Sequence, residues 1–364
     1  MLNGYRIIDS DGHVMEPPGL WEQRLPSELR DRMPQRLGGR WHYQGQAVTP
    51  PFPQQVQERF DRNRATHYKE YMEAGWSPAS QVKAMDRMGV DISFLYPTRG
   101  LILFGFDRME PRLAAAIARA YNDWLHDFCQ HDPKRLKPVA GLSLNDPEEA
   151  VVELRRVVDT FGMKAIFVRP NPLDGRLLSD PAYEPLWAEC EAEGVAVGIH
   201  EGSNAPVARA GDDRFRSHFS RHACAHPMEQ MMAFLTLLEG GVLERHPSLR
   251  FAFLESGCGW LPYWLWRLDE IEYKNVGFEI EANVKMKPSD YFRRQCYIAA
   301  EPEPYLGDLV KHIGEDRILF GSDYPHPDHG PDITDDLVKL EGLVSRPVLQ
   351  KLLWDNPKRF YDQS

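Results

Sequence analysis

Five apolar runs in this 364-residue chain end in side chains that can bind a metal ion or transfer a proton. In ILFGSDYPHPDH, residues 318–329, apolar or small residues lead to Asp323, and His326 follows between two prolines that hold the chain extended. A carboxylate at the end of a buried strand needs a partner, because an unpaired charge in an apolar interior is costly. A metal cation is the simplest partner, and pairing with Arg or Lys is the alternative.

Two more of these runs end in pairs of polar residues. In YRIIDSDGH, Asp11 and His13 are two residues apart, so both project from the same face of a strand. Asp9 lies two residues before Asp11 and projects from the same face of the strand. It is about 6–7 Å farther from the strand end, where a structural role is expected. In VAVGIHE, His200 ends the strand and Glu201 projects to the opposite face, which predicts a structural role for Glu201. The alternatives are a solvated turn for the first pair and a hydrogen-bonded core histidine for His200.

The remaining runs end in Glu255, in FAFLES, and in Glu301, in CYIAAE. His226 is a further candidate and is the last of three histidines spaced four residues apart, beginning at His218. The proline that follows His226 favours a helix start there, since proline is common in the first helical turn. The three histidines are then not expected to share one helical face, and His226 either joins the metal centre or caps the helix.

Short apolar runs alternate with longer runs of helical periodicity, which indicates repeated βα units and a parallel sheet. The number of such units is that of a (β/α)8 barrel. The predicted strands cover residues 5–11, 91–97, 137–144, 164–170, 195–201, 251–256, 296–301 and 318–323. The predicted helices cover residues 79–88, 111–129, 147–160, 181–193, 227–244, 260–274, 303–313 and 346–355.

We therefore predict an α/β fold, a (β/α)8 TIM barrel, formed by a single domain over residues 1–364. Residues 41–78, rich in Pro, Gln, Tyr and Arg, and the polar residues 203–222 are too long for ordinary connections. We interpret both as inserted lid or interface loops. In such barrels the chemistry lies at the C-terminal ends of the strands, which is where the candidate side chains fall.

The composition excludes some classes of partner. The chain has 43 Lys and Arg against 54 Asp and Glu, a net charge of −11 and no dense basic run, so nucleic acid is not expected to bind. No stretch of 18 uninterrupted apolar residues is present, so a membrane span is not expected. The five cysteines are dispersed without a CxxC pair, and the N-terminus has no leader pattern, which predicts a cytoplasmic protein.

Several long motifs occur in order along the chain: DSDGH, MDRMGVDISFLYPT, GIH, GGVLERHPSLRFAFLESGCGWLPYWLWRLDE, and GEDRILFGSDYPHP with a closing NPKRFY. With these motifs the chain resembles the amidohydrolase-related branch of the amidohydrolase superfamily, which includes aminocarboxymuconate semialdehyde decarboxylase and the resorcylate decarboxylases. The resemblance implies a distorted barrel that holds a divalent metal at the strand ends. It matches Asp11 and His13 to the first-strand ligands, His200 to the fifth-strand ligand and Asp323 to the last-strand carboxylate.

Two positions depart from the family pattern. Many relatives have histidine in place of Asp11, and the decarboxylases have a catalytic histidine where this chain has Glu255. The ordinary pKa of glutamate is about 4.3, against about 6.5 for histidine, so Glu255 is expected either to bind metal or to act as a base after desolvation. There are more candidate ligands than one tetrahedral ion needs, so one octahedral ion or two ions are expected. The candidates are Asp11, His13, His200, Glu255 and Asp323, with His226, Glu301 and His326 as additional ones.

The leading hypothesis is a metal-dependent enzyme that hydrolyses or nonoxidatively decarboxylates a small carboxylated or aromatic substrate. A divalent metal (Zn, Fe or Mn) polarises the substrate oxygen and lowers the pKa of bound water, while Glu255 or Asp323 moves the proton and His226 is a third catalytic candidate. Arg99 and Arg169 follow the second and fourth strands and are candidates for holding a substrate carboxylate, since a guanidinium binds it through two hydrogen bonds. Salt bridges in loops are the alternative for both arginines.

Two other hypotheses remain open. Imidazoles and carboxylates with open positions also suit a dinuclear iron or manganese oxygenase, a non-heme type found among proteins that resemble this chain. The third hypothesis is an inactive barrel that pairs with an active homologue, which the retained metal motif disfavours. The expected partners are a small-molecule substrate and a second copy of the chain, because the resemblance implies a dimer and the Trp-rich segment 259–270 offers an apolar surface.

Overall fold

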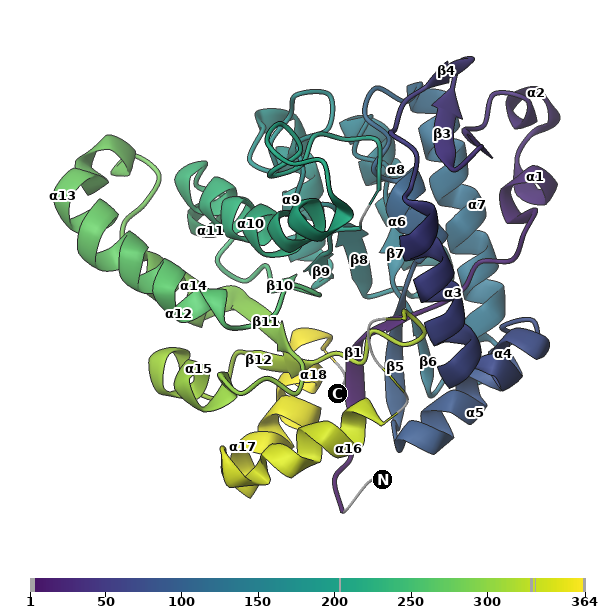
Figure 1. Ribbon diagram of the computed structural model, residues 1–364. Coiled ribbons are helices and arrows are strands. Elements are labelled where there is room, and N and C mark those ends of the chain that lie inside the picture. Colours follow the sequence, from purple (N-terminus) through teal and green to yellow (C-terminus); the bar gives the residue numbers. More distant parts are fainter. Residues whose placement is uncertain (1–3, 203, 328–329, 331, 363–364) are drawn as a thin grey trace.

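The computed structural model describes residues 4–202, 204–327, 330 and 332–362, and parallel strands surrounded by helices form its centre (Figure 1). The strands pair in two runs, β1-β5-β6 and β12-β11-β10-β9-β8-β7, and every pair in them is parallel. The strands are β1 (Ile8–His13), β5 (Ile92–Tyr96), β6 (Leu136–Pro138), β7 (Ala140–Gly141), β8 (Ala165–Val168), β9 (Ala196–Ile199), β10 (Phe251–Phe253), β11 (Cys296–Ala300) and β12 (Ile318–Phe320).

Two junctions join these runs into a closed barrel. At the first, β6 and β7 are separated only by Val139, whose backbone N–H donates to the Leu95 carbonyl of β5 (3.3 Å). At the second, the chain beyond β12 pairs with β1, where the Asp323 N–H donates to the Asp11 carbonyl (2.9 Å). Counting β6 and β7 as one strand, the predicted order of strands is confirmed, and with it the predicted (β/α)8 barrel.

The first strand is buried along its whole length although it contains charged residues. Asp9 lies deepest and accepts hydrogen bonds from Ser93 Oγ (3.1 Å), the Ser322 N–H (2.9 Å) and Ser322 Oγ (2.7 Å). A buried carboxylate is tolerated when such donors surround it. Asp9 therefore links β1 to β5 and to the segment after β12, which is the structural role predicted for it.

The helices surround the strands (Figure 1). Most of the predicted helices form within a few residues of their predicted bounds, and several further helices were not predicted, the longest of them outside the inserted segments at Pro288–Gln295. None of the helices in the described part of the chain has the length and apolar character that a membrane crossing needs. Outside the inserted segments the helices are α1 (Leu20–Arg24), α2 (Ser27–Arg30), α5 (Pro78–Met88), α6 (Arg99–Leu103), α7 (Pro111–Cys129), α8 (Pro147–Phe161), α9 (Glu184–Ala192), α11 (Val242–Arg245), α12 (Trp260–Trp266), α13 (Lys274–Val276), α14 (Pro288–Gln295), α15 (Leu306–Ile313), α16 (Ile333–Val338), α17 (Arg346–Gln350) and α18 (Asn356–Phe360).

Helix α10 (His218–Glu239) begins earlier than the sequence predicted. Ser217 caps it by accepting the Ser220 N–H (3.2 Å), and Pro227 lies inside the helix. The predicted helix start at residue 227 is therefore wrong, because a proline in a helix interior was taken for one in a first turn. The N-capping alternative for the residue before that proline is wrong for the same reason.

The three histidines of α10 do share one face of the helix, contrary to the prediction. The ring centroids of His218 and His222 are 5.1 Å apart, and those of His222 and His226 are 4.4 Å apart. Residues four apart on a helix lie one above the other. The spacing of these residues was a valid signal, and the misplaced helix start concealed it.

The inserted residues 41–78 contain regular structure and are not only loop. Helix α3 (Gln54–His67) has no buried residue, so it lacks the apolar stripe by which a helix is recognised in a sequence. Asn63 on this helix donates to the Pro327 carbonyl (3.4 Å), which places α3 beside the segment after β12. The other elements here and just before are β2 (Gln35–Leu37), β3 (Arg40–Tyr43), β4 (Gln46–Ala47) and α4 (Lys69–Glu73).

Gly321 lies where the chain leaves β12, and it has no room for a side chain. A Cβ atom on it would be 2.6 Å from the Asp11 Cβ, so one of the two segments would have to move. We expect Gly321→Ala to lower the free energy of unfolding by about 1–3 kcal/mol, as overpacking does in other cores. Urea unfolding followed by circular dichroism measures the change.

Gly342→Ala is the matched control for this variant. A Cβ atom on Gly342 meets no atom within 4 Å, and the residue is not in the left-handed region. Its free energy of unfolding should stay within about 1 kcal/mol of the unsubstituted protein. Equal losses in the two variants would contradict a tight approach of the two segments.

Candidate metal centre

The candidate ligands meet at the C-terminal ends of the barrel strands. They come from β1 and from the segments that follow β9, β10 and β12, so residues from both ends of the sequence contribute. The candidate ligands form two groups that share His13, and within each group the ligand atoms lie within 4.8 Å of one another. The first group is Asp11, His13 and His200, and the second is His13, Glu255, Asp323 and His326.

His13 is oriented so that one ring nitrogen faces the centre of this cluster. Its Nδ1–H donates to the Pro97 carbonyl (2.8 Å), which fixes the tautomer because a carbonyl can only accept. Its Nε2 atom lies 3.4 Å from Asp11 Oδ1 and 3.5 Å from Asp323 Oδ1. A backbone acceptor behind an imidazole is the usual way in which proteins orient a metal-binding histidine.

His200 is held in the same manner. Its Nδ1–H donates to the Glu201 carbonyl, so its Nε2 atom is directed to the cluster. This Nε2 atom lies 3.3 Å from Asp11 Oδ1 and 3.2 Å from Glu255 Oε2. Two imidazoles, one from β1 and one from the end of β9, therefore direct their Nε2 atoms to the same carboxylate, that of Asp11.

Three buried atoms of the first group test whether a cation fits. Asp11 Oδ1, His13 Nε2 and His200 Nε2 are buried and have no hydrogen-bond partner among the described residues. Buried polar atoms nearly always have partners, so such a group needs an explanation. A divalent ion among these atoms satisfies all three, and an imidazole and carboxylate donor set suits zinc, iron or manganese.

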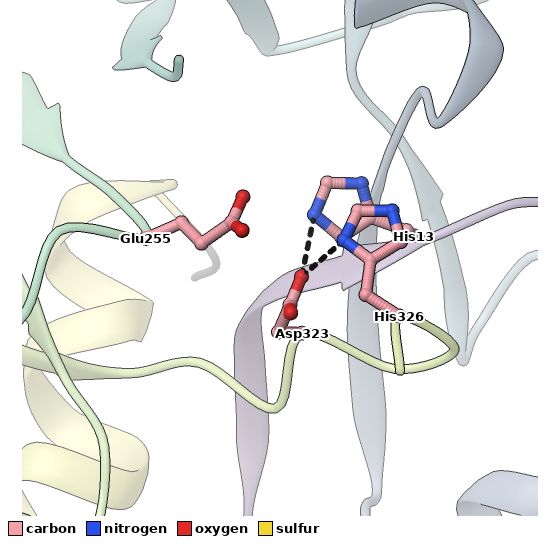
Figure 2. Close-up of side chains that lie close together, drawn as sticks. All are labelled: His13, Glu255, Asp323 and His326. Carbon is pink, nitrogen blue, oxygen red and sulfur yellow. Dashed lines mark hydrogen bonds and ion pairs between the residues drawn. The ribbon is translucent and has the colours of Figure 1, made fainter. Parts of the chain in front are cut away.

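Asp323 and Glu255 both have an unusual backbone. Their φ angles are 53° and 44°, in the left-handed region that residues other than glycine rarely occupy. Strain of this kind is found at functional sites, where it places a side chain. Figure 2 shows one oxygen of the Asp323 carboxylate facing a nitrogen of both His13 and His326, with Glu255 directed toward the same imidazoles. His326 Nδ1 lies 2.5 Å from Asp323 Oδ1, and its Nε2 lies 3.0 Å from Thr98 Oγ1.

The protonation states favour binding of a cation. Burial alone would raise the pKa of Asp11, but the neighbouring His200 and His13 hold it below its ordinary value. Burial would also raise the pKa of Glu255, but His226 and His200 hold it well below its ordinary value. Both carboxylates are thus ionised at neutral pH. Burial, together with the nearby His13, lowers the pKa of His326, which leaves a neutral imidazole.

A buried network supports the cluster from behind. Glu201 Oε1 pairs with Arg169 Nη2 (2.9 Å), and Glu201 Oε2 lies 3.6 Å from His226 Nδ1. The other ring nitrogen of His226, Nε2, lies 3.5 Å from Glu255 Oε1. Glu201 therefore has the structural position predicted for it. His226 belongs to neither ligand group and contacts one of the ligands.

The guanidinium of Arg169 is held by protein acceptors, and this residue does not line the cavity described next. Its side chain is buried, and its guanidinium donates to Glu201, to Asn171 Oδ1 (2.9 Å) and to the Leu101 carbonyl (2.7 Å). A guanidinium held by these acceptors positions Glu201. Arg169 thus forms a salt bridge, as the alternative interpretation expected, but a buried one, whereas Arg99 is exposed and lines the cavity described next.

Glu301 lies outside both ligand groups of the described residues. It follows β11 directly, and its N–H donates to Glu303 Oε1 (3.5 Å). Glu303 accepts the Cys258 N–H through both oxygens (2.9 and 3.0 Å), away from the cluster. The segment after β11 therefore supplies the Glu303 carboxylate to the loop after β10. Glu301 is not part of the ligand groups among the described residues.

A cavity of about 300 Å³ opens above the cluster. Its floor includes His226, Glu255 and His326. Both inserted segments contribute residues to its lining. The lining residues from these segments are Trp41, Thr49, Pro50, Phe52, Gln57, Phe60 and Arg64 from 41–78, and Asn204 and His222 from 203–222.

Sequence reasoning missed two arginines of this cavity. Arg36 on β2 and Arg64 on α3 line it together with Arg99 on α6. They belong to polar stretches with no motif, so nothing in the sequence places them near the barrel. For Arg64 the only signal was the interpretation of residues 41–78 as a lid or interface loop, and nothing in the sequence pointed to Arg36, which lies before that segment.

The chain belongs to the amidohydrolase family: the sequence model described as Amidohydrolase matches residues 8–363. It is 30% identical over 271 residues to the gamma-resorcylate decarboxylase of Rhizobium sp. (strain MTP-10005), covering 70% of this chain and 79% of that protein. It is 27% identical over 291 residues to the 2-amino-3-carboxymuconate-6-semialdehyde decarboxylase of Dictyostelium discoideum, covering 78% of this chain and 76% of that protein.

A solved structure confirms the fold. It is a dihydroxybenzoic acid decarboxylase from Polaromonas sp. JS666 with bound manganese and an inhibitor, 2-nitroresorcinol. It superposes with a TM-score of 0.70 at 21% identity and covers 98% of this chain and 97% of that chain. The resemblance inferred from the motifs is therefore confirmed for the family and for the barrel.

Removing a ligand should release metal and leave the barrel folded. We expect His200→Ala and Asp323→Ala each to weaken metal binding at least about 100-fold, since even the outer partners of metal ligands are worth about 10–100-fold. Elemental analysis after gel filtration measures the bound metal, and circular dichroism checks the fold. His312→Ala, a solvent-exposed histidine on α15, is the control and should keep its metal. An undiminished metal content in the first two variants would exclude them as ligands.

Glu255→Gln distinguishes a ligand from a base, because it keeps the shape of the side chain and removes its charge. We expect this variant to lose bound metal as well as activity, since Glu255 belongs to the second ligand group. The control is Glu301→Gln, which should keep its metal. If Glu255→Gln instead kept all of its metal and lost only about 10²–10⁴-fold in rate, Glu255 would be a proton-transfer group.

Proposed function

We propose that this protein is a metal-dependent decarboxylase that removes CO2 from a small aromatic carboxylate without an oxidant. The observation that carries the proposal is the composition of the cavity. A cluster of metal-binding side chains forms its floor, while aromatic and arginine side chains line its walls. Relatives that are decarboxylases of carboxylated substrates support the same reaction class.

The cavity matches an aromatic acid in both size and chemistry. A volume of about 300 Å³ is at the small end of ligand sites, which favours a single ring. Trp41, Phe52 and Phe60 offer faces and edges against which a ring can pack. Arg99, the candidate from the sequence, together with Arg36 and Arg64, offers guanidinium groups to an anionic substituent.

Asp11, His13, His200 and Asp323 would hold the metal, with Glu255 as a further ligand. When bound, a divalent cation supplies Lewis-acid polarisation of a substrate oxygen. Zinc, iron and manganese all suit the donor set, and manganese is present in the dihydroxybenzoic acid decarboxylase. The two ligand groups support one ion or two.

The chain's own residues then direct the bond change. When the bond between the ring and the carboxylate breaks, its electron pair stays on the ring carbon and CO2 leaves, so this carbon must receive a proton. His226 lines the cavity, and its ring lies between the carboxylates of Glu255 and Glu201, which allows it to hold that proton. With Glu255 as a ligand, we assign the proton transfer to His226. Glu255 or Asp323 takes this role if the Gln variant keeps its metal.

We also propose that the protein is cytoplasmic and that it forms a dimer. The five cysteines are all free thiols, which supports a reducing, cytoplasmic setting. Tyr263 and Trp266 on α12 are about half exposed, at 56% and 52%, and they support the expected dimer.

A substrate assay tests the proposed reaction. Manganese-loaded protein is incubated with a panel of hydroxybenzoates that includes gamma-resorcylate, under air and under argon, and CO2 is measured. We expect equal rates in both atmospheres and, in D2O, one deuterium on the carbon that lost the carboxylate. A requirement for O2 would favour the dinuclear oxygenase, release of an acid without CO2 would favour hydrolysis, and no turnover of any substrate by metal-loaded protein would favour the inactive barrel.

A further inference from the structure

A second cavity, of about 700 Å³, lies outside the barrel between α10, residues 170–179 and residues 279–283. It shares no lining residue with the cavity above the metal cluster. Its volume is within the range of small-molecule sites. Much of the lining is apolar and includes Leu177, Met232 and Ile280.

Helix α10 forms one wall of this cavity. Glu229, Met232, Thr236 and Glu239 are spaced so that they lie on one side of the helix, and all four line the cavity. The segment opposite is tied to the end of this helix, because Asn283 Nδ2 donates to the Glu239 carbonyl (2.9 Å). The cavity is therefore bounded by elements that are bonded to each other.

Glu229 is a buried acid without a counter-ion. The residue is 3% exposed, and its Oε1 atom accepts the Ala210 N–H (2.5 Å). In the part of the chain that the structure describes, no lysine, arginine or histidine nitrogen lies within ion-pair distance of it. The charges of Arg169 and Arg209 act on Glu229 from farther away, and both guanidiniums are paired with other carboxylates.

The missing counter-ion indicates the charge that a ligand in this cavity would carry. Burial raises the pKa of Glu229 to about 7, which reflects the cost of a charge that lacks a partner. Glu239 and Glu279 add two exposed acids to the lining, whereas the one lining arginine, Arg209, is paired with Asp212 (3.2 Å). A positive group beside Glu229 would supply the counter-ion, and the apolar walls would cover the rest of the ligand.

We propose that this cavity binds a small organic cation, an amine with an apolar body, whose ammonium group pairs with Glu229. The site is separate from the metal cluster, so the proposal does not depend on the reaction catalysed there. Charge and apolar surface must both be present in the ligand, because the cavity offers one buried carboxylate among hydrophobic walls.

The proposal is tested with phenethylammonium and its neutral analogue 2-phenylethanol. Isothermal titration calorimetry of the full-length, metal-loaded protein gives the affinity of each. We expect the ammonium compound to bind at least about 10-fold more tightly than the alcohol, as a charge-assisted hydrogen bond predicts. Equal affinities, or no binding of the ammonium compound, would overturn the proposal.

Variants locate the binding. Glu229→Gln should weaken phenethylammonium at least about 10-fold, whereas Glu22→Gln, an exposed acid on α1, should not. Met232→Trp should block binding by filling the cavity while the carboxylate stays in place, and it decides the question if the Gln variant does not fold. Unchanged affinity in folded Glu229→Gln or in Met232→Trp would overturn the proposal. A change of oligomeric state in Met232→Trp, measured as the mass of the assembly in solution, would also overturn the proposal, because it would assign the cavity to a second copy of the chain.

Discussion

Closure of the barrel between β1 and the segment beyond β12 is the constraint on which the metal centre depends. Asp9 bonds to Ser322 across this junction, and Gly321 allows the two segments to approach within contact of Asp11. A buried carboxylate such as Asp9 is stable only when donors surround it, so its hydrogen bonds fix the alignment of the two segments. That alignment places Asp323 beside His13.

The cluster also depends on a second set of buried charges. Arg169 pairs with Glu201, and Glu201 in turn lies beside His226, which contacts Glu255. A buried ion pair adds little net stability, because desolvation offsets much of the attraction. Its effect here is geometric, since each partner restricts the position of the next. This series of side-chain contacts connects the end of β8 to the segment after β10.

The sequence predicted the barrel well because the strands are short apolar runs, five of which end in polar side chains, and such a pattern depends on local residues. For the same reason it singled out Asp11, His13, His200 and Asp323, which the fold brings together. It failed where tertiary packing decides the outcome. Helix α3 has no buried residue, and Pro227 lies inside a helix whose cap is ten residues earlier, at Ser217. The role of Arg169 could not be predicted, since its partners come from two other segments.

The order of the ligands along the sequence affects how the protein matures. Asp11 and His13 are synthesised among the first residues described, and Asp323 and His326 more than 300 residues later. During most of translation the first strand therefore lacks the neighbouring strand that closes the barrel. Its polar residues have no partner on the side that β12 later occupies. Domains generally fold as units during synthesis, but this barrel cannot close before β12 has left the ribosome. Metal loading is consequently a late event, coupled to chain completion, and a nascent chain that stalls before β12 would hold only part of the ligand set.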